Sequence, residues 1–229
     1  MIGAFLLAVA AQITVRPEPV EARVQGARAS TSSARRDEDI TPLDAERDFA
    51  ADAQRLGQWS AFRKWAAPAA IFLPPENVHA ALKDAPDPAK SVEWWPTAGF
   101  LSCDGTLGAN TGGAVWPDGR TNFFSTLWAK QAAGGWRWTL DHGGDLAAPR
   151  PRPAADPAIR RASCDNKPRG LIQVKRKGTQ QGSGTSKDKT LGWSWTVEPD
   201  GTRVFYVHLW TGTTYEPVIA DRVAAPKPK

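Results

Sequence analysis

Three tight-turn signals follow one another in the middle of the chain and constrain its fold more than any other feature. Asp104-Gly105, Asp118-Gly119 and Gly134-Gly135 separate runs in which apolar and polar residues alternate. Such dipeptides between alternating runs are among the strongest short-range signals for β-hairpins. We therefore expect a meander of four antiparallel strands, at residues 91–103, 106–116, 120–131 and 136–142.

The fourth expected strand carries two residues that can transfer protons, Asp141 and His142. Because successive residues of a strand point to opposite faces, we expect these two side chains on opposite sides of the sheet. The face of His142 is then expected to carry Trp136, Trp138 and Leu140 as well. In the second strand, Gly112-Gly113 indicates a bulge or a strong bend.

Three helices are expected before the meander. In the first, Thr41 is a suitable N-cap and Pro42 suits the first helical position. Gly57 ends this helix, a second helix covers about 59–66, and a short third helix follows Pro74-Pro75. Helices followed by a meander predict an α+β domain over residues 41–146, with the helices packed on a curved sheet.

The other segments differ in composition from this domain. Residues 1–12 form a short apolar run whose Ala8-Val9-Ala10 fits a signal-peptide cleavage site, which predicts a periplasmic or secreted protein without a transmembrane segment in its mature form. Residues 13–40 are Pro-, Ser- and Arg-rich, so we expect a disordered insertion. A Pro-rich linker at 147–162 precedes a β-rich extension at 163–222, and 223–229 is a tail.

In the C-terminal extension we expect four more strands, at 171–176, 191–197, 203–210 and 214–220, and a polar loop at 178–189. Residues 150–229 carry fifteen basic and seven acidic residues, so the net positive charge of the chain comes from this part. The charges are scattered and match no nucleic-acid motif, so no nucleic-acid partner is expected.

The chain has two cysteines, Cys103 and Cys164. In an oxidising compartment an even pair often forms a disulfide, and two free buried thiols are the alternative. Both interpretations stay open at this point, because the sequence gives no distance between the two residues.

Residues 41–146 resemble the nuclear transport factor 2-like superfamily, which includes SnoaL-like and ketosteroid-isomerase-like proteins. The resemblance lies in Ala45–Ala50 (AERDFA), Gly57–Phe62 (GQWSAF) and Trp138–Asp145 (WTLDHGGD), the last two also resembling exported bacterial members. It implies a cone-shaped α+β fold, cystatin-like, in which helices cover a four-stranded meander. It implies no single function, because this fold hosts isomerases, dehydratases, hydrolases and non-catalytic binders.

Asp141 and His142 are the candidate catalytic residues, each as a general acid or base. The isomerases of the resembling superfamily also use an acidic donor, often Tyr, to hold an enolate. Both tyrosines, Tyr206 and Tyr215, lie outside the resembling region, which counts against that chemistry. The alternative is a structural Asp that binds backbone N–H groups at Gly143-Gly144, beside a partly exposed His.

Tryptophan is unusually frequent, with 11 residues against 2 Tyr and 1 Met. We expect most of the indoles in a core, but some of them are candidates for the lining of a ligand pocket. These candidate ligand-binding residues are Trp59, Trp65, Trp94, Trp128 and Trp138.

Three functional hypotheses remain. The first is an exported protein that binds a small apolar ligand without a reaction, and the second is an isomerase, dehydratase or hydrolase using Asp141 or His142. The third is a polymer- or protein-binding module that uses the basic strands around Lys175-Arg176-Lys177.

No cofactor is expected, and the three His at 79, 142 and 208 form no metal-ligand pattern. A homodimer stays open. A polar pair buried in a closed cavity would favour the enzyme.

Overall fold

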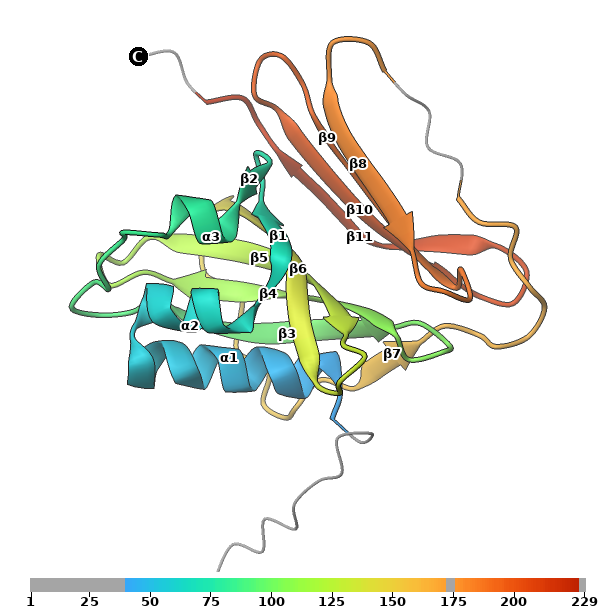
Figure 1. The fold of residues 1–229 in the computed structure, drawn as a ribbon, viewed down its shortest axis with the longest axis horizontal. Helices are drawn as coiled ribbons and strands as arrows, with labels where there is room; N and C mark the ends of the chain where they lie inside the picture. The colour runs from blue at the N-terminus through green and yellow to red at the C-terminus, as the bar shows by residue number, and fades with distance from the viewer. Residues whose placement is uncertain (1–39, 172–175, 227–229) are drawn as a thin grey trace, which may run out of the picture. The chain divides into compact units, whose positions relative to one another are not determined.

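The computed structural model describes residues 40–171 and 176–226, which form a mostly β structure (Figure 1). It contains a seven-stranded mixed sheet and a separate four-stranded antiparallel sheet. The predicted signal peptide at 1–12 and all but the last residue of the predicted insertion at 13–40 lie outside the described residues. None of the described helices is long and apolar enough to cross a membrane.

The helices of the described chain are few and short. They are α1 (Pro42–Leu56), α2 (Gln58–Trp65) and the four-residue α3 (Val78–Ala81). The start of α1 is as predicted: Thr41 accepts from the Asp44 backbone, and the Asp44 carboxylate accepts from the Thr41 backbone in a capping box. Figure 1 shows α1 and α2 lying across the seven-stranded sheet.

The seven-stranded sheet contains the expected meander. Its strand order is β2-β1-β6-β5-β4-β3-β7, and the neighbours from β6 to β3 are antiparallel. The strands are β1 (Ala66–Phe72), β2 (Glu76–Asn77), β3 (Glu93–Leu101), β4 (Leu107–Val115), β5 (Thr121–Lys130), β6 (Trp136–Leu146) and β7 (Ile159–Arg161). Two pairs, β1 with β6 and β3 with β7, are parallel.

The predicted fold class, three helices on a four-stranded antiparallel cone, is therefore wrong. Residues 66–72 form β1, which hydrogen-bonds in parallel to the free side of β6. Residues 159–161, inside the expected Pro-rich linker, form β7 beside β3. Both strands add to the edges of the meander, and each is paired through main-chain groups that carry no side-chain signal. Whether these two segments form strands depends on the neighbouring strands β6 and β3, and not on a sequence pattern in the segments themselves.

The C-terminal strands form the separate sheet, in the order β11-β10-β9-β8. The strands are β8 (Gln180–Thr185), β9 (Leu191–Val197), β10 (Arg203–Trp210) and β11 (Tyr215–Val223). The β8 strand lies in the segment expected to be a polar loop, where Gly182 and Gly184 leave space for the rings of Trp195 and Trp193. Of the strand expected at 171–176, residues 172–175 lie outside the described part.

Two apolar cores hold the structure together. The first lies between the helices and one face of the seven-stranded sheet and contains Phe49, Trp94, Phe124, Trp128 and Trp138. The second joins the opposite face of that sheet to the four-stranded sheet. It includes Leu107, Leu127 and Leu140 from the larger sheet and Trp195, Phe205, Val207 and Leu209 from the smaller one.

A pair of similar turns links the two sheets at the end of β3. Asp104, in the β3–β4 turn, and Asp188, in the β8–β9 turn, each accept a hydrogen bond from the other's backbone N–H, at 3.0 and 2.7 Å. Each carboxylate also accepts from a Ser hydroxyl two residues earlier, Ser102 or Ser186. The disulfide between Cys103 and Cys164 lies beside this contact and ties the β3–β4 turn to the segment after β7.

Candidate functional site

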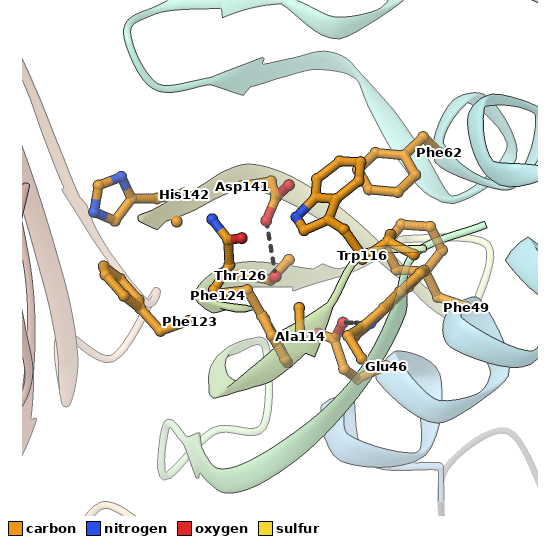
Figure 2. A pocket seen from close by; sticks show the side chains of 14 residues that line it. Glu46, Phe49, Phe62, Ala114, Trp116, Phe123, Phe124, Thr126, Asp141 and His142 are labelled. Atoms are coloured by element: carbon orange, nitrogen blue, oxygen red, sulfur yellow. Dashed lines mark hydrogen bonds between the residues drawn. The ribbon is translucent and has the colours of Figure 1, made fainter. Parts of the chain in front are cut away.

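A cavity of about 130 Å³ is lined by residues of the helices and of the seven-stranded sheet (Figure 2). An engineered apolar cavity of about 150 Å³ holds benzene, so this one suits a group of similar size. Helices α1 and α2 and strands β3 to β6 all contribute to its wall. The lining residues are Glu46, Phe49, Phe62, Val92, Trp94, Ala114, Trp116, Asn122, Phe123, Phe124, Thr126, Asp141, His142 and Gly143.

Glu46 is a fully buried carboxyl group on α1. Three N–H groups point at it: Trp94 donates to Oε1 at 2.9 Å, and Trp128 and Asn110 donate to Oε2 at 2.8 and 3.3 Å. Burial nevertheless raises the pKa of Glu46 to about 7, although these hydrogen bonds act to lower it. Because all three neighbours donate, the ionised form of Glu46 is the better partner for them.

Asp141 is the second carboxyl group of the cavity and comes from β6. Burial, and secondly the charge of Glu46, raise the pKa of Asp141 to about 7. Thr126 on the neighbouring strand donates to Oδ1 at 3.3 Å (Figure 2). The residue as a whole is partly accessible. Since Asp141 lines the cavity, we assign that accessibility to the cavity rather than to bulk solvent.

A bulge in β6 decides which residue faces the cavity. Leu140 pairs with Leu127, but Trp138 pairs with Trp128, so Thr139 is an extra residue between the two pairs. A bulge of one residue reverses the alternation beyond it. Trp138 therefore lies in the helix-side core, Leu140 in the core between the sheets, and Asp141 on the helix side. The expected single face for Trp138, Leu140 and His142 is wrong for this reason.

His142 points away from Asp141, as expected for neighbours on a strand (Figure 2). Its ring lies between Phe123 and Phe205, with centroids 5.8 and 5.9 Å away, and only 2% of the residue is exposed. Neither ring nitrogen has a partner among the described residues. Burial, and secondly the charge of Arg203, lower the pKa of His142 to about 4, so the imidazole is neutral near pH 7.

Of the five tryptophans proposed as ligand-binding, the structure places one, Trp94, in the cavity wall. Trp128 and Trp138 are fully buried in the helix-side core, where Trp128 holds Glu46. Trp65 donates to Asp52, and Trp59 packs against the ring of Phe62. A different indole, Trp116, lines the cavity instead.

Asp52 shows what a structural carboxylate looks like in the same helix. It accepts from Lys64, Trp65 and Arg55, and although burial acts to raise its pKa, these donors lower it to about 2. Asp52 is therefore ionised and fixed, which contrasts with the raised pKa values of Glu46 and Asp141. The two kinds of buried carboxyl group differ in whether a cation lies beside them.

Glu46 was missed by the sequence reasoning, although a signal for it exists. It precedes Phe49 by three residues and Ala53 by seven, so it lies on the apolar face of the predicted first helix. An acidic residue on such a face needs buried partners. Those partners, Trp94, Asn110 and Trp128, come from three strands, and no local pattern brings them together.

No known family, curated protein or solved structure matches the chain. The resemblance of residues 41–146 to the nuclear transport factor 2-like superfamily thus stays a prediction. No three His, Cys, Asp or Glu side chains in the described part of the chain lie close enough to hold a metal ion. The disulfide between Cys103 and Cys164 is a bond typical of oxidising compartments, and the periplasmic or secreted location stays a prediction.

Proposed function

We propose that the chain is an acid–base enzyme that acts on a small, largely apolar substrate in this cavity. One observation carries the proposal: two buried carboxyl groups with raised pKa values, Glu46 and Asp141, line one aromatic cavity. Carboxyl groups that titrate near neutral pH are suited to general acid and base catalysis, because they exchange protons readily there.

The two carboxyl groups have different roles in this proposal. Glu46 is held by three N–H donors and acts as the anion. Asp141 receives one side-chain hydrogen bond, from the Thr126 hydroxyl, and is the group that carries the proton to the substrate. The charge of Glu46 keeps Asp141 protonated to a higher pH, as in paired carboxylates elsewhere.

The electrostatics favour reactions in which positive charge develops on the substrate. Protonation of a hydroxyl leaving group or of a double bond creates such charge, and the Glu46 carboxylate stabilises it. In dehydration, water leaves with the donated proton and the resulting Asp141 carboxylate takes a proton from the neighbouring carbon. In double-bond isomerisation, Asp141 protonates one end of the double bond and its carboxylate then removes a proton from the carbon beyond the other end. An enolate would meet the same carboxylate unfavourably.

A second candidate is a binding protein without a reaction. It is favoured by the wall of the cavity, where most of the lining residues are aromatic or aliphatic, as in ligand pockets generally. The polymer-binding hypothesis rested on Lys175, Arg176 and Lys177. Lys175 lies outside the described residues, so that hypothesis stays a prediction.

The proton-carrying role of Asp141 is testable without a known substrate. The ¹³C signals of the side-chain carboxyl groups, assigned with Asp141→Asn and Glu46→Gln variants, report each titration by NMR. We expect Asp141 to titrate near the raised value of about 7. A midpoint for Asp141 in the ordinary range of about 4 would contradict the proposal.

Turnover is tested on a panel of small allylic alcohols, followed by NMR for dehydration or migration of the double bond. Loss of a general acid typically lowers the rate by about 10²–10⁴-fold, which we expect for Asp141→Asn. The control Asp84→Asn makes the same change at an exposed site and should leave the rate unchanged. A binder without activity would give no turnover above the rate without protein.

A further inference from the structure

The lining of the cavity includes donors in Thr126, Trp116 and His142, but its charged groups are all carboxyl groups. Asp141 and Glu46 supply carboxyl oxygens, and none of the fourteen described lining residues is Lys or Arg. Asn122 adds a further acceptor, because its Nδ2 donates to Asp145 while its Oδ1 is buried without a partner. A buried acceptor without a donor is costly, so a ligand that supplies positive charge or N–H groups would complete this site.

Aromatic rings form much of the remaining wall. Phe49 lies edge-on to both Phe62 and Trp94, with centroids 4.8 Å apart in each pair, and Phe124 completes this set. Arg120 and Arg150 already lie over two other lining rings, those of Trp116 and Phe123, at 5.0 and 5.3 Å. The other four lining rings have no cation over them among the described residues, so they are available for a cation–π contact with a ligand. They are Phe49, Phe62, Trp94 and Phe124.

We propose that the cavity binds a small organic ammonium ion, with its charge beside Asp141 and its alkyl groups against Phe49, Phe62, Trp94 and Phe124. This inference deepens the proposed function, because it names the ligand class of the same site. A stable ammonium ion carries the positive charge that the proposed reaction creates only transiently. The aromatic wall and the carboxyl groups act on the same charge.

The size of the cavity limits the ligand. About 130 Å³ accommodates a body comparable to benzene, which excludes long-chain or polycyclic amines from full enclosure. The ammonium group suits the polar end, where Asp141, Thr126 and Asn122 come from the neighbouring strands β5 and β6. The helix side of the cavity supplies Phe49 and Phe62.

The test compares two probes of the same shape. Choline carries a quaternary nitrogen, and its neutral isostere has a quaternary carbon at that position. Calorimetry at about pH 8 should give an affinity for choline roughly tenfold or more above that for the isostere, the size of one good cation–π contact. Because choline does not titrate, its affinity should rise from about pH 5 to about pH 8 as the carboxyl groups ionise.

Two variants test the carboxyl charge and the aromatic wall of the cavity separately. Asp141→Asn should lose about tenfold or more in choline affinity while binding the isostere as before, and the exposed control Asp84→Asn should match the wild type. Phe62→Leu removes one ring but no charge, and should also weaken choline more than the isostere. It keeps the test informative if Asp141→Asn does not fold, which circular dichroism reports.

Equal affinity for the two probes, or an affinity for choline that does not change with pH, would overturn the inference. In that case the proposed function survives if Asp141 still titrates near 7 and the allylic alcohols are turned over. Failure of both probes to bind would also overturn it. An ordinary pKa for Asp141 in the NMR titration would instead remove the proposed function itself, so the two failures are distinguishable.

Discussion

The buried ionisable residues of this protein divide according to their neighbours. Asp52 lies beside Lys64 and Arg55 and has a lowered pKa, whereas Asp141 lies beside another carboxyl group and has a raised one. Burial, and secondly the charge of Glu46, raise the pKa of Asp141, whereas hydrogen bonds from Lys64, Trp65 and Arg55 lower that of Asp52 against the effect of its burial. The difference marks Asp141, rather than Asp52, as the carboxyl group that can change its charge near neutral pH.

Asp141→Asn should stabilise the protein at high pH. The folded-state pKa of Asp141 is raised to about 7 from 3.8, so the folded state binds more protons between these values and loses stability as the pH rises through them. At about pH 8 the neutral amide avoids the buried charge, and we expect a gain of roughly 2 kcal/mol in the free energy of unfolding. At about pH 4 the gain should vanish.

Urea denaturation at both pH values measures this effect, and Asp84→Asn controls for the loss of one negative charge at the surface. A variant that is less stable than the wild type at about pH 8 would show that Asp141 is held mainly by favourable contacts of its ionised form.

His142 has the opposite pH dependence. Its folded-state pKa is lowered to about 4 from 6.5, so the unfolded chain binds more protons and stability is lost as the pH falls from 6.5 towards 4. His142→Leu should remove this loss, worth about 2 kcal/mol between about pH 7 and about pH 5. At about pH 7 the substitution should cost little, because neither ring nitrogen has a described partner.

Thermal unfolding of the wild type and of His142→Leu at the two pH values checks this expectation. Parallel curves for the two proteins would mean that His142 is already charged, or reaches water, in the folded state.

At the level of elements, local patterns predicted the positions of the strands better than the direction of their side chains. The three turn signals placed β3 to β6 within a few residues, and Gly112 lies opposite the bulge between Pro96 and Ala98 in β3, as expected. At Gly112 a Cβ atom would come within 2.0 Å of the Trp95 carbonyl oxygen. The glycine is therefore required by the close approach of the β3 backbone, and this requirement is visible in the sequence.

The bulge at Thr139 could not be predicted in the same way. Its neighbours Trp138 and Leu140 are both large and apolar, so either face is acceptable for each of them. The bulge lets Trp138 enter the helix-side core and Leu140 the core between the sheets. It is the existence of two cores, a property of the whole molecule, that makes this arrangement favourable. The sequence thus singled out Asp141, which lines the cavity, but neither Glu46 nor the bulge that decides the face of Asp141.

At the scale of the whole molecule, the four-stranded sheet is attached through more than its apolar face. The carboxylates of Asp104 and Asp188 exchange hydrogen bonds with each other's turns, and Thr190 accepts from the Cys103 backbone at 2.8 Å. These contacts lie 84 to 87 residues apart in sequence, so no local signal could indicate them. Both turns contain a Ser and an Asp at the same spacing, and in each turn the Ser hydroxyl donates to the Asp carboxylate.

The disulfide should be the largest single contribution to this attachment. Cys103 and Cys164 are 61 residues apart, and closing a loop of that length lowers the entropy of the unfolded chain by an amount worth about 4 kcal/mol. A Cys103→Ser/Cys164→Ser double variant should lose up to that free energy of unfolding in urea. Reduction of the wild type should have the same effect, and the reduced double variant should show no further change.

If instead the double variant is as stable as the wild type, the hydrogen-bonded turns and the apolar core between the sheets suffice to keep the loop closed. Because Asp141 lies on the other face of the seven-stranded sheet, its titration should persist in the double variant under conditions where the protein stays folded.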